Sequence, residues 1–163
     1  MPILRRLREV LDAAGVHYEI LHHQTAYTAE ETAAVQHVPG TEMAKVVMCM
    51  AGDPPHETPL MAVVPAPWRV HLPTLARAAE VPRLRLATEA EFAGLFPGCE
   101  PGAMPPFGAL YGIPTWVDER LAQDEHIVFN AGTHQLAVRM AWADYARLES
   151  PRIADFAVRH EDG

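Results

Sequence analysis

Residues 102–112 constrain the fold more than any other stretch, because they combine glycines and prolines with no charged side chain. Proline fixes φ and removes a backbone donor, whereas glycine leaves its N–H group approachable in conformations that other residues avoid. The stretch therefore predicts a rigid loop that presents mainly its backbone. Such a loop is either a connection between two elements or a backbone surface held against a ligand.

Lysine is almost absent from this chain, although the chain is not short of cations. Of its 13 basic residues twelve are arginine, and Lys45 is the only lysine. Lys45 lies in the apolar run 44–50, which has the length of a strand. A lysine retained where arginine is otherwise used indicates a position that needs a compact ammonium group rather than a planar guanidinium. The alternative is a lysine at a strand edge whose stem carries the charge out to water.

The size and composition are those of one folded domain that spans residues 1–163. A chain of 18.0 kDa with 49% hydrophobic residues can build one substantial core. Its apolar runs are too short to cross a membrane, and the N-terminus lacks the layout of a signal peptide, so we expect a cytoplasmic protein. Cys49 and Cys99 are far apart without a CxxC spacing, which favours two reduced thiols.

The formal net charge of -8 argues against a protein that grips nucleic acid over a large surface, DNA included. The net charge is still compatible with local contact to nucleic acid, because arginines cluster in two short stretches. Each cluster is either a phosphate-binding patch or a solvated face. The clusters are Arg5, Arg6 and Arg8 beside Glu9, and Arg69, Arg77, Arg83 and Arg85 beside Glu80.

Hydrophobic spacing and turn residues predict helices and strands mixed without strict alternation, which indicates an α+β fold around a curved mixed β-sheet. Two capping boxes, at 28–31 and 88–91, each open a short helix. The other expected helices cover 3–14 with Gly15 as its C-cap, the segment after Pro73, 142–148 and 153–158. The expected strands are 16–21, 44–50, 60–64 antiparallel to 44–50, 115–118, and a hairpin of 126–130 with 133–140 turning at Ala131-Gly132.

Several catalytic signatures are absent from the sequence. It has no GxSxG elbow, P-loop, HExxH motif or dinucleotide-binding glycine pattern. The nine histidines are scattered or adjacent rather than spaced as ligands, so we predict neither a metal site nor a cofactor. A thiol nucleophile at Cys99 with His134 as its base is an alternative that no local signature supports.

Several segments in order resemble the YbaK and prolyl-tRNA synthetase editing-domain family, from about residue 23 to residue 155. The most specific are the Lys45 strand and the GxxxP loop 102–106, which Phe107-Gly108 follows as the family expects. The turn 129–134 departs from the histidine-bearing turn of the alanine- and cysteine-specific editors, and residues 110–112 look like a subgroup extension. Further matches are His23, Tyr27-Thr28 and Glu31, then Val64-Pro65-Ala66, Arg69-Val70 and Leu75-Ala76.

The resemblance implies a barrel-like α+β domain that hydrolyses mischarged aminoacyl-tRNA in trans, with water or a tRNA hydroxyl as nucleophile and without metal or cofactor. The implied partner is the acceptor end of aminoacyl-tRNA, and delivery by a synthetase stays open. The expected catalytic residues are Lys45, Gly102, Ala103, Met104 and Gly108. The expected substrate-binding residues are His23, Tyr27, Thr28, Pro105, Pro106, Phe107, Thr133 and His134.

Physical chemistry fits these roles. Ester hydrolysis needs donors for the developing oxyanion, which the N–H groups of the loop supply except at its prolines. Lys45 would hold the terminal phosphate or the substrate carbonyl by its charge. The rival interpretation is a non-catalytic module of the same fold that binds aminoacyl-tRNA or an amino-acid-like ligand.

Overall fold

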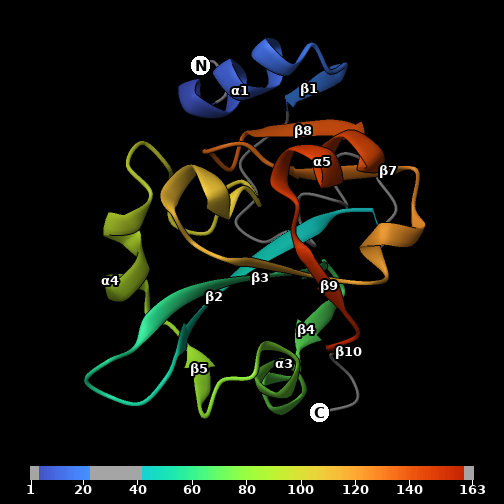
Figure 1. The fold of residues 1–163 in the computed structure, drawn as a ribbon. Coiled ribbons are helices and arrows are strands. Elements are labelled where there is room, and N and C mark those ends of the chain that lie inside the picture. Colours follow the sequence, from blue (N-terminus) through green and yellow to red (C-terminus); the bar gives the residue numbers. More distant parts are fainter. Residues whose placement is uncertain (1–3, 23–41, 160–163) are drawn as a thin grey trace.

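The structure is a computed structural model that describes residues 4–22 and 42–159 (Figure 1). Its helices are α1 (Arg5–Ala14), α3 (Leu72–Ala79), α4 (Glu89–Phe92) and α5 (Trp142–Glu149), with 3-10 turns η1 (Ala93–Leu95), η2 (Gly108–Tyr111) and η3 (Leu121–Gln123). Its strands are β1 (Tyr18–His22), β2 (Ala44–Ala51), β3 (Thr58–Pro65), β4 (Trp68–Val70), β5 (Leu84–Leu86), β6 (Thr115–Asp118), β7 (His126–Asn130), β8 (Leu136–Ala141), β9 (Arg152–Ala154) and β10 (Ala157–Arg159).

A five-stranded mixed sheet in the order β5-β2-β3-β6-β9 runs through the middle of the molecule (Figure 1). The predicted antiparallel pairing of β2 with β3 is confirmed, with Lys45 opposite Val64. Strand β6 lies parallel to both β3 and β9. The mixed α+β class is therefore confirmed, whereas the barrel-like closure is not seen, because the described strands form three separate sheets.

A three-stranded antiparallel sheet, β1-β8-β7, lies above the central sheet, and a two-stranded sheet of β10 and β4 lies below it with α3 (Figure 1). Two hydrophobic clusters fill the two spaces. The upper cluster contains Met48, Val63 and Phe107, and the lower one contains Cys49, Val64 and Leu75. Because side chains alternate along a strand, neighbouring residues of β2 and β3 belong to different clusters.

Local sequence signals place several elements correctly. Helix α1 ends at Gly15, which adopts the left-handed conformation with φ 69°. Thr88 and Glu91 form the predicted capping box at the start of α4. The predicted hairpin is confirmed as β7 paired antiparallel with β8. The capping box expected at 28–31 lies outside the described residues.

The prediction of a helix at 153–158 is wrong. These residues contribute to two short strands, β9 beside β6 and β10 beside β4. The carboxylate of the fully buried Asp118 accepts hydrogen bonds from the backbone N–H groups of Phe156 (3.0 Å) and Ala157 (2.9 Å). A side chain distant in sequence thus supplies the partners that a helix would otherwise have given this backbone.

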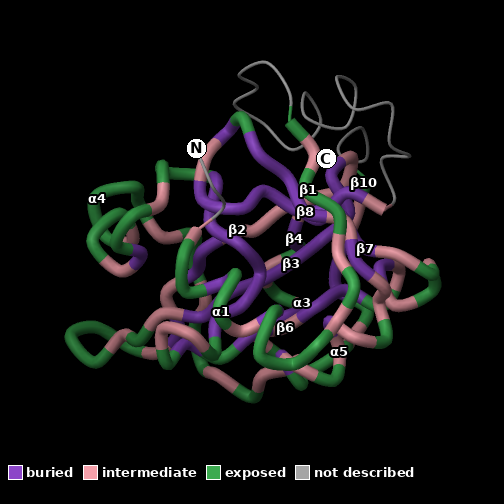
Figure 2. The backbone as a smooth tube through the Cα atoms, turned by 90° about the horizontal axis from the view of Figure 1, so that it is seen from above, coloured by how far each residue is buried: buried purple, intermediate pink, exposed green. Residues whose placement is uncertain are grey.

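Burial concentrates along the central strands, whereas α4 and the connection from β2 to β3 are largely exposed (Figure 2). Among the helices of the described ranges, none has the length and apolar character needed to cross a bilayer.

Candidate functional site

The Gly/Pro loop, residues 102–108, enters the upper cluster instead of lying on the surface. Only Gly102 is exposed, and residues 103–108 are buried. Gly102 has φ 85°, a conformation that glycine adopts without strain. Met104 and Phe107 pack among the core side chains, and Phe107 meets the ring of Phe129 edge to face at 5.6 Å between centroids. The stretch is therefore not a surface connection between two elements, and its rigidity stays a prediction.

Helix α5 fixes the loop from one side. The hydroxyl of the fully buried Tyr145 donates a hydrogen bond to the carbonyl of Pro106 at 2.7 Å. One turn later, a carboxylate oxygen of Glu149 accepts from the N–H group of Ala109 at 3.1 Å. Burial raises the pKa of Glu149, while hydrogen bonds from Thr115 and from the backbone of Ala109 and Gly108 oppose that rise. Two side chains of one helix therefore hold the loop and the turn that follows it.

Gly108 occupies a position that has no room for a side chain. An added Cβ atom would lie 2.3 Å from Oγ1 of Thr115 and 2.4 Å from the carbonyl oxygen of Ile113. The N–H group of Ile113 also donates to the carbonyl of Gly108 at 2.9 Å. Glycine is required here because the backbone at position 108 lies too close to Thr115 and to the backbone of Ile113 for any side chain.

One main-chain donor of the loop has no acceptor among the described residues. Within the described part of the chain, nothing accepts a hydrogen bond from the N–H group of Met104. A buried N–H group without a partner is uncommon, so a substrate oxygen or water is the expected acceptor. The other expected donors are engaged: Gly102 with Met104 Sδ (3.3 Å), Ala103 with the carbonyl of Glu100 (3.0 Å), Phe107 with the carbonyl of Pro105 (2.8 Å), and Gly108 towards the Glu149 carboxylate.

His134 lies against the start of the loop, as sequence reasoning expected of a substrate-binding residue. An added Cβ atom on Gly102 would be 3.4 Å from Nε2 of His134. Glu100 fixes the ring, because its Oε1 atom contacts both the backbone N–H group (2.6 Å) and Nδ1 (3.1 Å) of His134. The other ring nitrogen, Nε2, faces Gly102. Sequence reasoning missed Glu100, whose only signal was an acid two residues before the GxxxP motif.

Thr133, the neighbour of His134, closes the turn between β7 and β8. Its Oγ1 atom accepts a hydrogen bond from the N–H group of Gln135 at 3.2 Å. The loop is tied to the same turn, since the N–H group of Gly132 donates to the carbonyl of Ala103 at 2.9 Å. Gly102, Ala103 and His134 therefore form one neighbourhood.

Lys45 lies in a different neighbourhood. Its side chain lines a pocket of roughly 280 Å³ whose other walls, among the described residues, are Val47, Arg69, Val70, Leu72 and Leu86. Its strand neighbours Ala44 and Val46 pack in the upper cluster with Met104, so Lys45 points to the other face of β2. The described residues therefore do not place Lys45 and the Gly/Pro loop in one pocket. The expected substrate-binding residues His23, Tyr27 and Thr28 lie outside the described ranges.

Comparison with known proteins decides the family. The family model described as the aminoacyl-tRNA editing domain matches residues 23–148, which is most of the chain and includes both neighbourhoods.

The chain belongs to the aminoacyl-tRNA editing domain family.

A curated relative agrees with this family. The chain is 29% identical over 156 residues to the multifunctional Ser/Thr-tRNA deacylase ProXp-y of Escherichia coli K12, and the match covers 93% of this chain and 91% of the relative. Solved structures share the fold of the editing domain. One, a hypothetical protein, has a TM-score of 0.83 at 21% identity and covers 94% of this chain and 100% of its own. Another, a candidate trans-editing enzyme for prolyl tRNA synthetase, has a TM-score of 0.79 at 23% identity and covers 94% and 96%.

The editing domain does not present Cys99 as a reactive thiol. Its Sγ atom lies 3.8 Å from the hydroxyl of Tyr111, and burial raises the pKa of Cys99. A nucleophilic thiol needs the opposite shift, because the thiolate is the reactive form. His134 is turned towards Glu100, so the described contacts do not support the Cys99 and His134 alternative.

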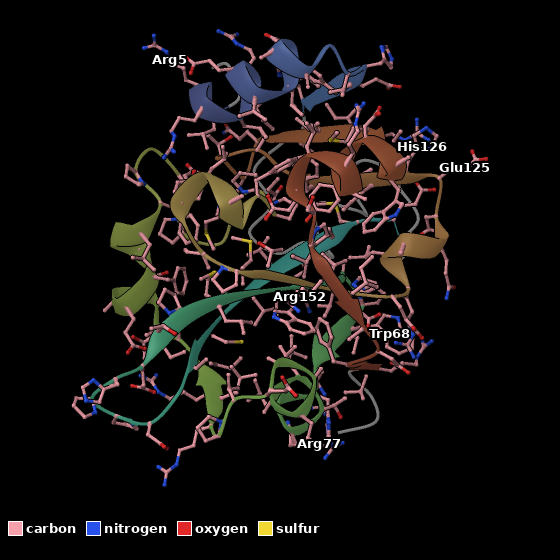
Figure 3. All side chains as sticks on the ribbon, in the orientation of Figure 1. Arg5, Trp68, Arg77, Glu125, His126 and Arg152 are labelled. Atoms are coloured by element: carbon pink, nitrogen blue, oxygen red, sulfur yellow. The ribbon has the colours of Figure 1, made fainter. Side chains whose placement is uncertain are left out.

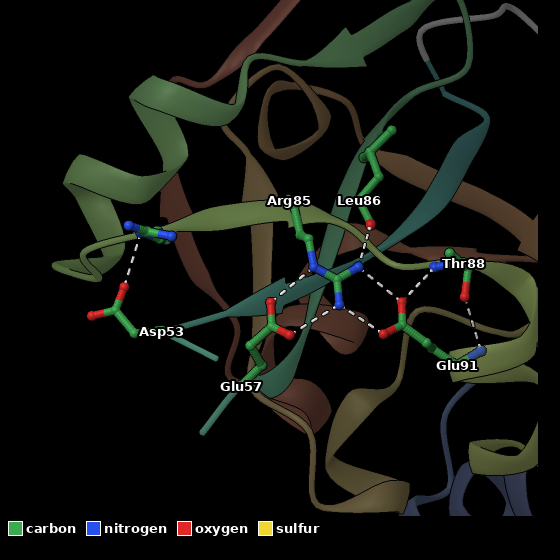
Figure 4. A network of polar contacts seen from close by, with 7 residues as sticks. Asp53, Glu57, Arg85, Leu86, Thr88 and Glu91 are labelled. Atoms are coloured by element: carbon green, nitrogen blue, oxygen red, sulfur yellow. Dashed lines mark hydrogen bonds and ion pairs between the residues drawn. The ribbon is translucent and has the colours of Figure 1, made fainter. Parts of the chain in front are cut away.

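Arg83 and Arg85, two of the four arginines in the second cluster, form ion pairs with acidic side chains. Arg85 contacts both Glu57 (2.8 Å) and Glu91 (2.7 Å), and Arg83 pairs with Asp53 at 3.0 Å (Figure 4). The guanidinium of Arg85 therefore links the β2–β3 connection to α4. This arrangement favours the solvated-face interpretation of Arg83 and Arg85 over phosphate contact.

Proposed function

We propose that this protein is an aminoacyl-tRNA deacylase that hydrolyses the ester of mischarged tRNA in trans, as one editing domain over residues 1–163. Membership of the aminoacyl-tRNA editing domain family carries the proposal. The relative's name supplies the reaction class, because ProXp-y is a Ser/Thr-tRNA deacylase. Delivery of the substrate by a synthetase is a finer proposal of the same kind.

The reaction takes place at the Gly/Pro loop. A water molecule, directed by the site or by a neighbouring hydroxyl of the tRNA, attacks the ester carbonyl. The bond from the carbonyl carbon to the sugar oxygen then breaks, the amino acid leaves as the free acid, and the sugar oxygen takes up a proton and leaves as an alcohol. The N–H group of Met104 donates to the developing oxyanion, because it is buried and no described residue accepts from it. His134, fixed by Glu100, faces Gly102 and orients the attacking group or the substrate's amino group. The catalytic effect is positioning and charge stabilisation.

Lys45 binds the tRNA rather than the carbonyl in this proposal. Its ammonium group belongs to a pocket on the other face of β2, where it attracts a phosphate of the bound tRNA. Glu149 and Tyr145 act on the reaction only through the loop, because their contacts are with Ala109 and the carbonyl of Pro106.

The experiment that tests the function is a deacylation panel. Ser, Thr, Ala and Cys are each charged on tRNA for proline and on other acceptors, and release of the free amino acid is followed at catalytic levels of the protein. Many turnovers on at least one substrate support the deacylase. Stoichiometric binding without release on every member of the panel supports the rival, a non-catalytic module that binds aminoacyl-tRNA.

A further inference from the structure

Asn130, the last residue of β7, has a buried side-chain oxygen without a hydrogen-bond donor. The residue is 6% exposed, and in the described part of the chain nothing donates to its Oδ1 atom. A buried acceptor without a donor costs free energy, so a ligand atom is expected to donate to it. Each of the other buried polar side chains of the described residues has at least one hydrogen bond, namely Thr115, Asp118, His134 and Glu149.

The polar side chains at the start of β7 contrast with Asn130. Glu125, just before the strand, is exposed and reaches out from the molecule, and Nδ1 of His126 contacts Arg139 at 3.2 Å (Figure 3). Water and a neighbouring side chain therefore satisfy these groups. Asn130 lies on the same face of the strand as His126 but at its buried end, where its Oδ1 atom has neither.

The strand register places Asn130 beside Lys45. Met43, which precedes β2, forms a parallel bridge with Val128 of β7, and the two side chains belong to one hydrophobic cluster. Lys45 and Asn130 follow two residues further along each chain, and side chains two residues apart point to the same face. The side chains of Asn130 and Lys45 therefore lie next to each other on one face of β2.

Asn130 is also close to the Gly/Pro loop. Two residues after it, the N–H group of Gly132 donates to the carbonyl of Ala103 at 2.9 Å. Asn130 thus lies between the lysine proposed to bind phosphate and the loop proposed to cleave the ester. A tRNA end held by Lys45, with its ester at the loop, brings the attached amino acid to Asn130.

The surroundings of the Asn130 oxygen indicate the class of donor. An ammonium group is disfavoured, because one neutral amide oxygen does not compensate for burying a full charge and Lys45 repels a second cation. The apolar neighbours include Ala137, which is opposite Asn130 on β8, and Ala66, and such small residues leave room only for a short side chain. A neutral hydroxyl group on a short side chain fits both conditions.

We propose that Asn130 selects the amino acid that is removed, because its Oδ1 atom accepts a hydrogen bond from the hydroxyl group of a short side chain, that of serine or threonine. The inference rests on the proposed function and names the substrate class of the same site. Asn130 contacts the substrate side chain and takes no part in the attack on the ester. An amino acid without the hydroxyl group leaves the buried oxygen unpaired, which is how a polar site rejects an apolar analogue.

The test compares two esters of the same shape. The same tRNA is charged with serine or with 2-aminobutyrate, which has a methyl group in place of the hydroxyl group. The value of kcat/KM for deacylation is measured for wild type and for Asn130→Leu, which removes the polar atoms at similar size. Gln123→Leu, at an exposed amide of η3, is the matched control, since the chain has no second asparagine.

Wild type is expected to deacylate the serine ester at least about tenfold faster than the 2-aminobutyrate ester, because one buried polar atom is left unpaired with the latter. Asn130→Leu should lose at least about tenfold on serine and change less than about threefold on 2-aminobutyrate, so that the preference disappears. Gln123→Leu should match wild type. Equal rates of wild type on the two esters would overturn the inference, and this comparison depends on no variant. An equal loss on both esters in Asn130→Leu would also overturn it, since the amide would then bind a group that all substrates share.

Thermal unfolding provides a second measurement. Replacing an unpaired buried amide with an apolar side chain of similar shape removes no hydrogen bond, so Asn130→Leu should have a melting temperature equal to or above that of wild type. A lower melting temperature together with an equal loss on both esters would assign Asn130 a structural role and overturn the inference.

Failure of this inference is distinguishable from failure of the proposed function. If no member of the deacylation panel is hydrolysed, the proposed function fails. If wild type removes alanine, cysteine or 2-aminobutyrate as fast as serine, the proposed function stands and only the selection by Asn130 fails.

Discussion

Glu100 holds His134 at two points, accepting from its backbone N–H group at 2.6 Å and contacting its Nδ1 atom at 3.1 Å. Both contacts use the same carboxylate oxygen, so the acid fixes the chain and the ring of His134 together. The ring in turn fills the space next to Gly102, where an added Cβ atom would lie 3.4 Å from Nε2. The acid therefore sets the shape of the site at the start of the Gly/Pro loop.

Glu100→Ala is expected to reduce deacylation at least about tenfold, because the ring of His134 loses the contact that orients it. His134→Ala should cost a similar factor, and the double variant should be little worse than either single variant, since both remove one unit. Single-turnover rates on the best substrate of the panel provide the measurement. Glu119→Ala, at an exposed acid, is the control. Fully additive losses would show that Glu100 does not act through His134.

Tyr145→Phe should destabilise the protein by about 1–3 kcal/mol, because the carbonyl of Pro106 would remain buried without its donor. Tyr18→Phe is the matched control, because the hydroxyl of Tyr18 contacts the exposed Asp12 at 2.7 Å. Its removal should lower the free energy of unfolding by less than about 0.5 kcal/mol. Denaturant unfolding gives both values. Equal values for the two variants would contradict the role of α5 in fixing the loop.

Gly108→Ala is expected to fold poorly or to lower the free energy of unfolding by several kcal/mol, which is on the order of the largest effects of single substitutions. The reason is that Thr115 and the backbone of Ile113 would both have to move to make room for the added Cβ atom. Gly94→Ala serves as the control, since among the described residues no atom outside its own turn lies within 4 Å of an added Cβ there. Thermal unfolding of the two variants decides the question. A melting temperature near that of wild type for Gly108→Ala would mean that the loop can shift away from β6.

Local sequence signals were sufficient where the partners are close in sequence. Gly15 ends α1, and Thr88 with Glu91 begins α4, because a cap is formed by residues within one turn. The helix expected at 153–158 was wrong for the opposite reason. The backbone of this segment is bound by Asp118 and by strands β6 and β4. The six residues alone cannot predict these partners, because the partners are distant in sequence.

The candidate site also has features that could be predicted from the sequence and features that could not. The Gly/Pro loop and Lys45 were visible as unusual residues in their surroundings, but their relative placement depends on which face of β2 each side chain occupies. That face follows from the registration of β2 on β3, which pairs Lys45 with Val64 of the lower cluster. Glu100 was not selected as a site residue, because an acid near a turn is common, and only its contacts with His134 distinguish it.

Arg85→Gln should leave the salt dependence of tRNA binding unchanged, although the sequence placed Arg85 in an arginine cluster. Its guanidinium is already shared by Glu57 and Glu91, which lie on two different elements (Figure 4). The expected effect is a lower melting temperature, because the β2–β3 connection loses its link to α4. The measurement is the binding of an uncharged acceptor-stem hairpin to the full chain at several salt concentrations. Arg77→Gln, at an exposed arginine of α3, is the control. A slope reduced in Arg85→Gln alone would assign it to the tRNA surface.

Lys45→Arg is the most informative single substitution, because arginine is the cation that this chain uses everywhere else. A strand-edge lysine that only carries its charge to water would tolerate the change. In the pocket with Val47, Arg69 and Leu72, the wider guanidinium has to enter a space already bounded by hydrocarbon and by a second guanidinium. A displacement of about 1 Å in the bound phosphate can lower the rate about a hundredfold.

We therefore expect Lys45→Arg and Lys45→Ala both to fold with a melting temperature near that of wild type and both to lose deacylation by at least about a hundredfold. Single-turnover deacylation separates this loss from slower product release. Met50→Leu is a control on the same strand, because it changes a half-buried side chain of β2 that does not line the Lys45 pocket. Retention of most of the wild-type rate by Lys45→Arg would mean that any cation suffices at this position, and that lysine is found there for reasons unrelated to the reaction.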